Sequence, residues 1–311
     1  MPYGQDAVLG LCLQNSYGTA SVSSLHFMEI LNEGLSLNKE QQIREGMRGI
    51  FDENPNQEGK NTVESDIVIE AHAIPLGFML STIMSRSTSG TGRFTHRFTP
   101  NQTDFDNYAA NRPFTALVDL NSGSADRYSD LVASKLSLSI SQGGFMQATL
   151  SVMGGAYSQQ AAVAGSFPTG DVVDWSSTSL SLGGTASCAF EELTLNIDES
   201  LESIFTLCNK KTPSRIKRSG KRTVGISGTV LFDDRTEYQK FLAQSTQVFK
   251  AFFLTGSDSV LIDLPQLKYT AFPIPVDGPG QMRVSFEGKA EYHTGSASTC
   301  AITVVNTQAA Y

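Results

Sequence analysis

The residues that could carry chemistry are few and widely spaced along this chain. The four histidines stand alone, without the H-x-x-x-H or H-E-x-x-H spacing that places two imidazoles on one metal ion. The four cysteines are also single, and without a C-x-x-C pair they indicate neither a zinc site nor a disulfide framework. We interpret the cysteines as reduced thiols of a protein made in a cytoplasm, and we expect the histidines to be structural. These residues are His26, His72, His96, His293, Cys12, Cys188, Cys208 and Cys300.

Two pairs of adjacent carboxylates do not predict acid/base chemistry either. Glu191-Glu192 lies in a strand-like stretch, where neighbouring side chains point to opposite faces, and Asp233-Asp234 is better explained as a helix cap. The run 219–223 resembles a phosphate-binding loop, but Arg215 stands where the first glycine is required. No G-x-S-x-G elbow is present. The sequence therefore predicts no catalytic, cofactor or metal site, and we expect a protein that is not an enzyme.

One segment stands out by its charge. Residues 210–222 carry seven basic side chains and no acidic one. A solvated loop is one interpretation, and a docking arm for an acidic partner is the other. An acidic loop at 47–59 is its counterpart in the internal repeat described below, and opposite charges would fix the register between neighbouring subunits. The candidate contact residues are Lys210, Lys211, Arg215, Lys217, Arg218, Lys221 and Arg222 on the basic side and Glu45, Asp52, Glu53 and Glu58 on the acidic side.

The composition is that of a β-rich protein with an acidic surface. Of 311 residues, 40% are hydrophobic and only 17% are charged, and the difference is made up by small polar residues that suit strands and turns. The net charge of −8 argues against a protein whose main task is to grip nucleic acid. The N-terminal residues lack the pattern of a secretion signal, and no apolar run is long enough to span a membrane. We expect no membrane partner.

Alternation of apolar and polar residues with a period of two is the main pattern in the chain. It places Leu136, Leu138 and Ile140 on one face, with serines between them. A Gly-Gly pair follows, and residues 146–152 resume the alternation, which predicts a β-hairpin. Similar alternation recurs at 179–182, 193–197 and 282–286. The pattern predicts a mainly β fold.

Only two segments predict helices. Residues 75–83 begin with a proline, which suits a first turn, and repeat apolar side chains at helical spacing. Residues 233–242 begin with two aspartates that suit a cap, and Tyr238, Phe241 and Leu242 fall on one face. Each segment lies between strand-like stretches. We therefore expect one short helix in each half of the chain.

The two halves of the chain show ordered self-similarity. Short matches occur in the same order in both halves, with the two predicted helices at corresponding places. The matched segments are 18–21 with 184–187, 62–63 with 223–224, and 150–154 with 284–288. Matches that keep their order indicate an internal duplication. The predicted boundaries are 1–155 for a first domain, 156–165 for a linker and 166–311 for a second domain of the same kind.

Together these features resemble the major tail tube proteins of long, flexible-tailed bacteriophages of the siphovirus type. The resemblance runs through nearly the whole chain and depends on order and coverage rather than on one motif. Its carriers are the segments 10–19, 114–120, 135–153 and 280–288. It implies a duplicated tail-tube β-sandwich domain whose strands join those of its neighbours in a closed barrel around a lumen. It also implies a loop that reaches an adjacent ring of the virion's tail.

The resemblance further implies a structural role as the conduit for DNA ejection into the host, in a virion protein made in the host bacterial cytoplasm. The family commonly builds hexameric rings from single-domain subunits. Two tube domains in one chain would make three subunits sufficient, so we expect a trimeric, pseudo-hexameric ring; the alternative is a hexamer decorated by the second half. The implied partners are other copies of the chain, a tape-measure protein, tail terminator and tip proteins, and viral DNA in non-specific transit, without a cofactor.

A different class of function is a β-sandwich tail module that binds a receptor or a carbohydrate. Such a site usually shows clustered exposed aromatic side chains. The single tryptophan, Trp175, stands alone in a polar turn region, which favours the structural role.

Overall fold

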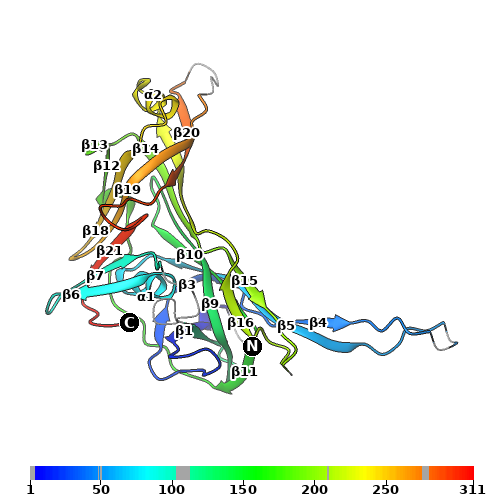
Figure 1. Ribbon diagram of the computed structural model, residues 1–311. Coiled ribbons are helices and arrows are strands. Elements are labelled where there is room, and N and C mark those ends of the chain that lie inside the picture. The colour runs from blue at the N-terminus through cyan, green and yellow to red at the C-terminus, as the bar shows by residue number, and fades with distance from the viewer. Residues whose placement is uncertain (1–3, 48, 50, 103–112, 209, 275–279) are drawn as a thin grey trace.

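The structure is a computed structural model that describes residues 4–47, 49, 51–102, 113–208, 210–274 and 280–311. It confirms the mainly β fold with short helices that the sequence predicts (Figure 1). A short 3-10 turn, Gly4–Asp6, precedes the first strand, and a second one, Trp175–Ser177, lies near the start of the second half of the chain. The strands are arranged as one long sheet with two covering sheets.

Among the described residues, eight antiparallel strands form the long sheet, and they come from both halves of the chain. Its order is β3 (Ile30–Glu33), β5 (Gln57–Glu70), β10 (Gln147–Gly154), β9 (Ser124–Ser141), β14 (Phe190–Asp198), β17 (Thr223–Leu231), β20 (Arg283–Ala290) and β19 (Asp258–Ala271). The halves meet where β9 pairs with β14, with Leu138 opposite Leu195 and Leu136 opposite Ile197. One continuous ladder of backbone hydrogen bonds therefore joins the two halves.

Each covering sheet shares one long strand with the long sheet, β9 in the first half and β19 in the second. The first sheet runs β2 (His26–Met28), β1 (Val8–Leu13), β8 (Phe114–Asp119), the N-terminal part of β9, and β11 (Ala156–Ala161). The second runs β13 (Thr185–Ser187), β12 (Thr178–Leu182), β18 (Gln247–Thr255), the N-terminal part of β19, β21 (Ala301–Asn306), β7 (Phe94–Thr99) and β6 (Ser85–Ser89). β9 passes from the first covering sheet to the long sheet at Leu131–Val132, and β19 passes from the second between Asp263 and Leu267. Within the long sheet each strand then shows one irregularity of register, at Ser134 in β9 and at Thr270 in β19.

The core lies between the long sheet and its covers, and it follows the alternation seen in the sequence. Leu136 and Leu138 are buried while Ser137 and Ser139 lie on the opposite face of the strand, and β18 and β20 alternate along their whole length. The predicted hairpin is formed by β9 and β10. Its turn contains Gly143 at a φ of 81°, a left-handed conformation that glycine adopts without a steric penalty.

The two helices differ more than the sequence indicates. Helix α1 (Ala73–Ile83) contacts β9 and β2 of the first half and β21 and β19 of the second. It is therefore buried nearly all round, where the sequence predicts a single apolar stripe. A Cβ atom on Gly77 would overlap the Tyr311 side chain, so a larger residue there would force Tyr311 or the helix to shift. Helix α2 (Thr236–Leu242) contacts β19 and buries no residue completely.

Two hairpins project from this body, as Figure 1 shows on its right side. The longer one, which we call the arm, consists of β4 (Asn38–Gln42) paired with the first part of β5, and it contains the predicted acidic loop. The shorter one consists of β15 (Leu201–Ile204) and β16 (Arg215–Arg218), and it contains the basic segment. The segment predicted as a linker, 156–165, begins with β11, because Tyr157 lies opposite Tyr128 of β9 and their rings are in contact.

Candidate functional site

The long sheet has one face on the core and one polar face, which we define as the outward side chains of the six strands from β5 to β20. Cross-strand neighbours form continuous rows; one row runs Gln147, Ser139, Thr194, Ser227 and Glu287 from β10 to β20. Hydroxyl and amide groups dominate. They belong to Ser137, Ser139, Gln147, Thr149, Ser151, Thr194, Asn196, Ser227, Thr229 and Ser285. The polar face therefore crosses the junction of the two halves without interruption.

Acidic side chains outnumber basic ones on the polar face. The acids are Glu64, Asp66, Glu70, Glu192, Asp198 and Glu287, and the bases are Lys135, Arg283 and Lys289. Nucleic acid binds strongly where lysine and arginine displace the counterions of its phosphates. A surface of neutral hydroxyls with excess carboxylates offers little of that attraction.

The structure places the predicted acidic contact residues along the arm. Glu45, Asp52 and Glu53 are exposed in its distal part, and Glu58 lies near its base. Three large apolar side chains lie beside them and are largely or fully exposed to solvent: Ile43 is 71% exposed, Met47 101% and Phe51 110%. The charge pattern alone did not reveal these apolar residues. A hairpin end that exposes such groups is expected to bury them against another surface.

One basic residue meets the acidic arm within the chain. Lys211 Nζ lies 2.6 Å from Glu58 Oε2, and Lys39 Nζ lies 3.5 Å from Glu58 Oε1. The hydrogen bond and charge of Lys211 lower the pKa of Glu58. The backbone N–H of Asn61 also donates to the backbone carbonyl of Lys211 at 2.8 Å. The basic segment therefore lies against the base of the arm.

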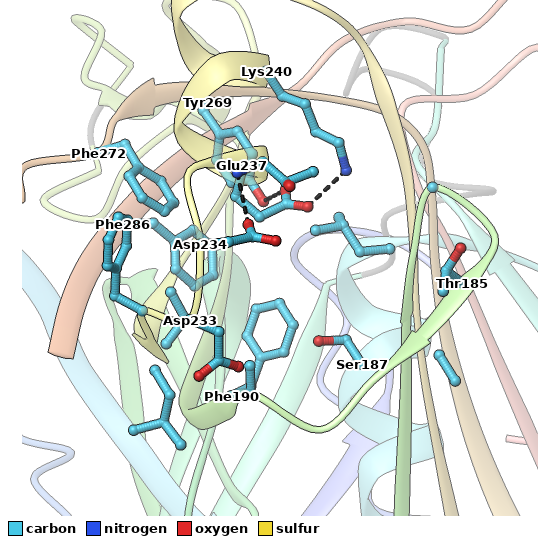
Figure 2. A pocket seen from close by; sticks show the side chains of 18 residues that line it. Thr185, Ser187, Phe190, Asp233, Asp234, Glu237, Lys240, Tyr269, Phe272 and Phe286 are labelled. Carbon is cyan, nitrogen blue, oxygen red and sulfur yellow. Dashed lines mark hydrogen bonds and ion pairs between the residues drawn. The ribbon is translucent and has the colours of Figure 1, made fainter. Parts of the chain in front are cut away.

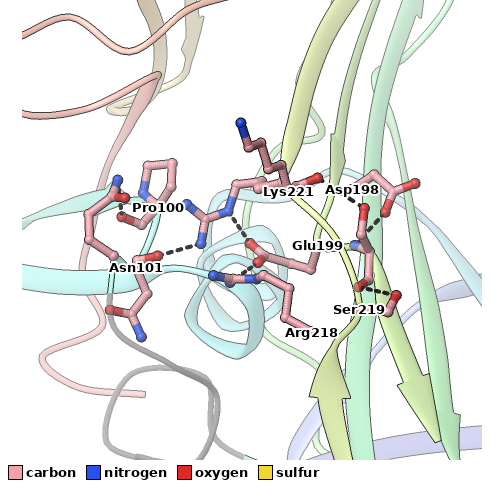
Figure 3. A network of polar contacts seen from close by, with 10 residues as sticks. Pro100, Asn101, Asp198, Glu199, Arg218, Ser219 and Lys221 are labelled. Atoms are coloured by element: carbon pink, nitrogen blue, oxygen red, sulfur yellow. Dashed lines mark hydrogen bonds and ion pairs between the residues drawn. The ribbon is translucent and has the colours of Figure 1, made fainter.

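Two further basic residues hold a buried carboxylate (Figure 3). Glu199 is fully buried just after β14; Arg218 pairs with one of its oxygens, and Arg222 Nε lies 2.5 Å from the other. Arg222 also donates to the Asn101 carbonyl at 2.5 Å. The sequence pattern did not single out Glu199, because nothing in the local sequence shows that it is buried. Lys210, Arg215 and Lys221 remain exposed, and Lys217 is partly buried on β16.

A comparison of the sequence with protein families finds a match over most of the chain. The family model described as phage tail tube protein matches residues 4–290. This chain belongs to the phage tail tube protein family. A search of the curated proteins finds no match.

As a member of this family, the tail tube protein is a structural component of the virion that polymerises with copies of itself into a tube. No helix in the described part of the chain has the length and apolar character needed to cross a membrane. Among the described residues, no group of three or more histidine, cysteine or acidic side chains converges as a metal site would.

The histidines of the tail tube protein have ordinary structural surroundings. His96 is buried, with Nε2 2.7 Å from the Gln308 carbonyl oxygen and Nδ1 2.9 Å from the Thr88 hydroxyl. Burial lowers the pKa of both His96 and His26. His72 Nδ1 lies 3.1 Å from the Gly170 carbonyl oxygen. Each of these contacts joins two segments of the folded chain.

A pocket of about 360 Å³ opens beneath helix α2 of the tail tube protein (Figure 2). Phe190, Phe272 and Phe286 line it together with an acidic rim. On that rim Glu237 accepts hydrogen bonds from the Tyr269 hydroxyl at 2.9 Å and from Lys240 Nζ at 2.6 Å. Burial raises the pKa of Tyr269, which keeps its phenol protonated. Glu237, Tyr269 and Lys240 thus bind one another at the rim.

Proposed function

We propose that three copies of this chain close into a pseudo-hexameric ring, and that stacked rings form the tail tube through which viral DNA passes during ejection into the host. The observation that carries the proposal is the strand order. Within the long sheet, β3-β5-β10-β9 of the first half is followed by β14-β17-β20-β19 of the second. The covering sheets repeat in the same way, since β2-β1-β8-β9-β11 corresponds to β13-β12-β18-β19-β21.

This order supports two tail-tube domains in one chain, which we place at 1–155 and 166–311. The intervening segment 156–165 leads from one to the other, and its first residues form β11, which completes the first covering sheet. Eight strands per copy would give a ring of three copies roughly 24 strands. Barrels of about 16 strands already leave an aqueous channel. The second half extends the same sheet through β14, which favours a trimer over a hexamer decorated by that half.

The polar face would line the lumen of such a ring. The opposite face of the long sheet is packed on the core and cannot line a channel. Hydroxyls and excess carboxylates suit a wall that DNA must pass without adhering.

The arm would connect stacked rings. Its bare apolar end and its acids project away from the body, and a contact that does not close on itself generates a filament. The exposed Lys210, Arg215 and Lys221 would receive its acidic end. We expect a tape-measure protein to occupy the lumen before DNA does, and terminator and tip proteins to cap the stack.

Electron microscopy of the purified protein with end-on averaging tests this proposal. We expect hollow tubes in which each ring contains three copies of the chain. Six copies per ring would contradict the trimer, and compact monomers at every concentration would contradict assembly by this chain alone.

Charge reversal tests the proposed contact between rings. The triple variant Lys210→Glu, Arg215→Glu, Lys221→Glu is expected to give single rings without tubes. Arg218 and Arg222 are left unchanged because they hold Glu199. A matched control reverses the exposed Arg97 and Lys250 on the second covering sheet and should form normal tubes. Normal tubes from the triple variant would refute the electrostatic contact.

A further inference from the structure

We propose that the ring closes by a specific strand pairing between copies, in which residues 35–38 of one chain pair antiparallel with residues 271–274 of the next. This inference rests on the proposed ring and specifies its interface. Leu35 would lie opposite Ile274, Ser36 opposite Pro273, Leu37 opposite Phe272 and Asn38 opposite Ala271. The partner is a second copy of this chain.

The template for this pairing is the junction already present within the chain. There β9, the last strand of the first four, pairs with β14, the first strand of the second four. The long sheet begins with β3 at one edge and ends with β19 at the other, and these correspond to β14 and β9. A pairing between β19 of one copy and β3 of the next would therefore repeat the internal junction.

Two irregularities fix which residues of β9 and β19 correspond. The register of β9 against β10 shifts at Ser134, and that of β19 against β20 shifts at Thr270. Lys135 and Ala271 are the first residues after the shift in each strand, opposite Ser151 and Glu287. Ser151 therefore corresponds to Glu287, and the sequence match of 150–154 with 284–288 is two residues out of register with the structure. In the internal junction Lys135 lies opposite Asp198. In the contact between copies, Ala271 of one chain should therefore lie opposite the first-half residue of the next chain that corresponds to Asp198.

That residue is Asn38. Asp198 lies opposite Thr223 of β17, and the Thr-Val pair at 223–224 matches the Thr-Val pair at 62–63 of β5. Thr62 lies opposite Asn38. The register of Glu33 against Ile67 continues unchanged to Asn38 against Thr62, so 34–37 occupy the intervening places beside β5. Asn38 opposite Ala271 then sets the remaining three pairs.

The side chains at both edges fit this register. In the internal junction Leu195 and Ile197 face the core beside Leu138 and Leu136, and all four are buried. At the outer edges Leu35 and Phe272 are buried, and Leu37 and Ile274 are partly buried against the core. The closing pair would place these four side by side in the same manner. Their neighbours would then continue the polar face.

The same edges carry features that restrain pairing with the wrong strand. An open edge presents free backbone donors and acceptors that can bind any other edge. Pro273 lacks a backbone N–H, and β3 spans only Ile30–Glu33 before the sheet loses its regular ladder. Ala271 still pairs with Glu287 of β20, so the segment that follows starts from a defined position. Correct closure then depends on matching the apolar pairs.

Cysteine cross-linking in assembled tubes tests the register. Residues directly opposite in an antiparallel pair have Cα atoms about 4.5 to 5.5 Å apart, within the reach of a disulfide. The variant Ser36→Cys, Pro273→Cys, made with the exposed Cys188 and Cys208 changed to serine, should give a covalent trimer on non-reducing gels. The control Ser36→Cys, Thr270→Cys is three residues out of register, roughly 10 Å, and should not. Asn196→Cys with Ser137→Cys, opposite each other in β14 and β9, should close within one chain.

Hydrogen exchange of the unmodified protein provides a second measurement that does not depend on substitution. Peptides covering 33–38 should exchange at least tenfold more slowly in tubes than in the unassembled chain. Tubes that form without the trimer cross-link and without this protection would overturn the register while leaving the tube function intact. A parent chain that forms neither rings nor tubes would overturn the proposed function and this interface together.

Discussion

Replacing Glu199 by glutamine isolates the contribution of the buried ion cluster. The substitution keeps the size of the side chain and removes its charge. Arg218 and Arg222 would then face each other across a neutral amide, with side chains only 20% and 9% exposed. Their positive charges would be poorly solvated and without their carboxylate.

The expected cost is large because the cluster is buried. Removing one partner of a buried ion pair typically destabilises a protein by about 3 to 5 kcal/mol. An equivalent change on the surface costs within about 0.5 kcal/mol. With a urea slope of about 3 kcal/mol per molar, the unfolding midpoint should fall by roughly 1 to 1.7 M.

Urea unfolding of the unassembled chain, followed by circular dichroism, measures this shift. Glu192→Gln is the matched control, because Glu192 is exposed on the same strand, β14, and should leave the midpoint nearly unchanged. A second variant, Glu199→Leu with Arg218→Met and Arg222→Met, removes all three charges and should be less destabilised than Glu199→Gln alone. A Glu199→Gln midpoint equal to that of the control would refute the reasoning.

Three further predictions concern other parts of the fold. Gly77→Ala should destabilise the chain by about 1 to 3 kcal/mol, because the added methyl group overlaps Tyr311. Most of that loss should disappear in a Tyr311→Ala background, which a double-mutant cycle followed by thermal unfolding would measure. Burial raises the pKa of Glu33, so the folded chain holds the Glu33 proton to a higher pH than the unfolded chain does, and the stability of the fold falls as pH rises through that window. Glu33→Gln should therefore raise the unfolding midpoint at pH 7 and lose this gain below about pH 4. An equal gain at both pH values would contradict the assignment. Hydrogen bonds from the Ser214 and Thr206 hydroxyls lower the pKa of the exposed Cys208 thiol. Iodoacetamide should therefore label Cys208 faster in the parent chain than in a Ser214→Ala variant at pH 7. Equal labelling rates by mass spectrometry would refute this.

Much of the fold follows from local pattern. Alternating residues such as Leu136 and Leu138 bury one face of a strand wherever that strand is placed, so the hairpin of β9 and β10 could be predicted without a structure. The two helical segments also lie where proline, aspartate and apolar spacing indicate. These signals act within a few residues of each other.

Local pattern does not predict which basic residues of the candidate site pair within the chain and which stay exposed. Seven basic residues in one segment predict a docking surface, but folding directs Lys211 to Glu58 and both Arg218 and Arg222 to Glu199. Which lysines and arginines stay exposed depends on residues that are distant in sequence. The apolar end of the arm was missed for a related reason, since Met47 and Phe51 are unusual only because nothing in the described chain covers them.

Composition and residue pattern are enough to predict a mainly β protein with an acidic, hydroxyl-rich surface and the ordered features of a tail tube protein. The pairing of β9 with β14, the enclosure of α1 by both halves and the polar face that crosses the junction become visible in the folded chain alone. The physical reason is that alternation specifies which face of a strand is buried but not which strand lies beside it. Strand partners are selected by packing and hydrogen bonding between segments far apart in the chain.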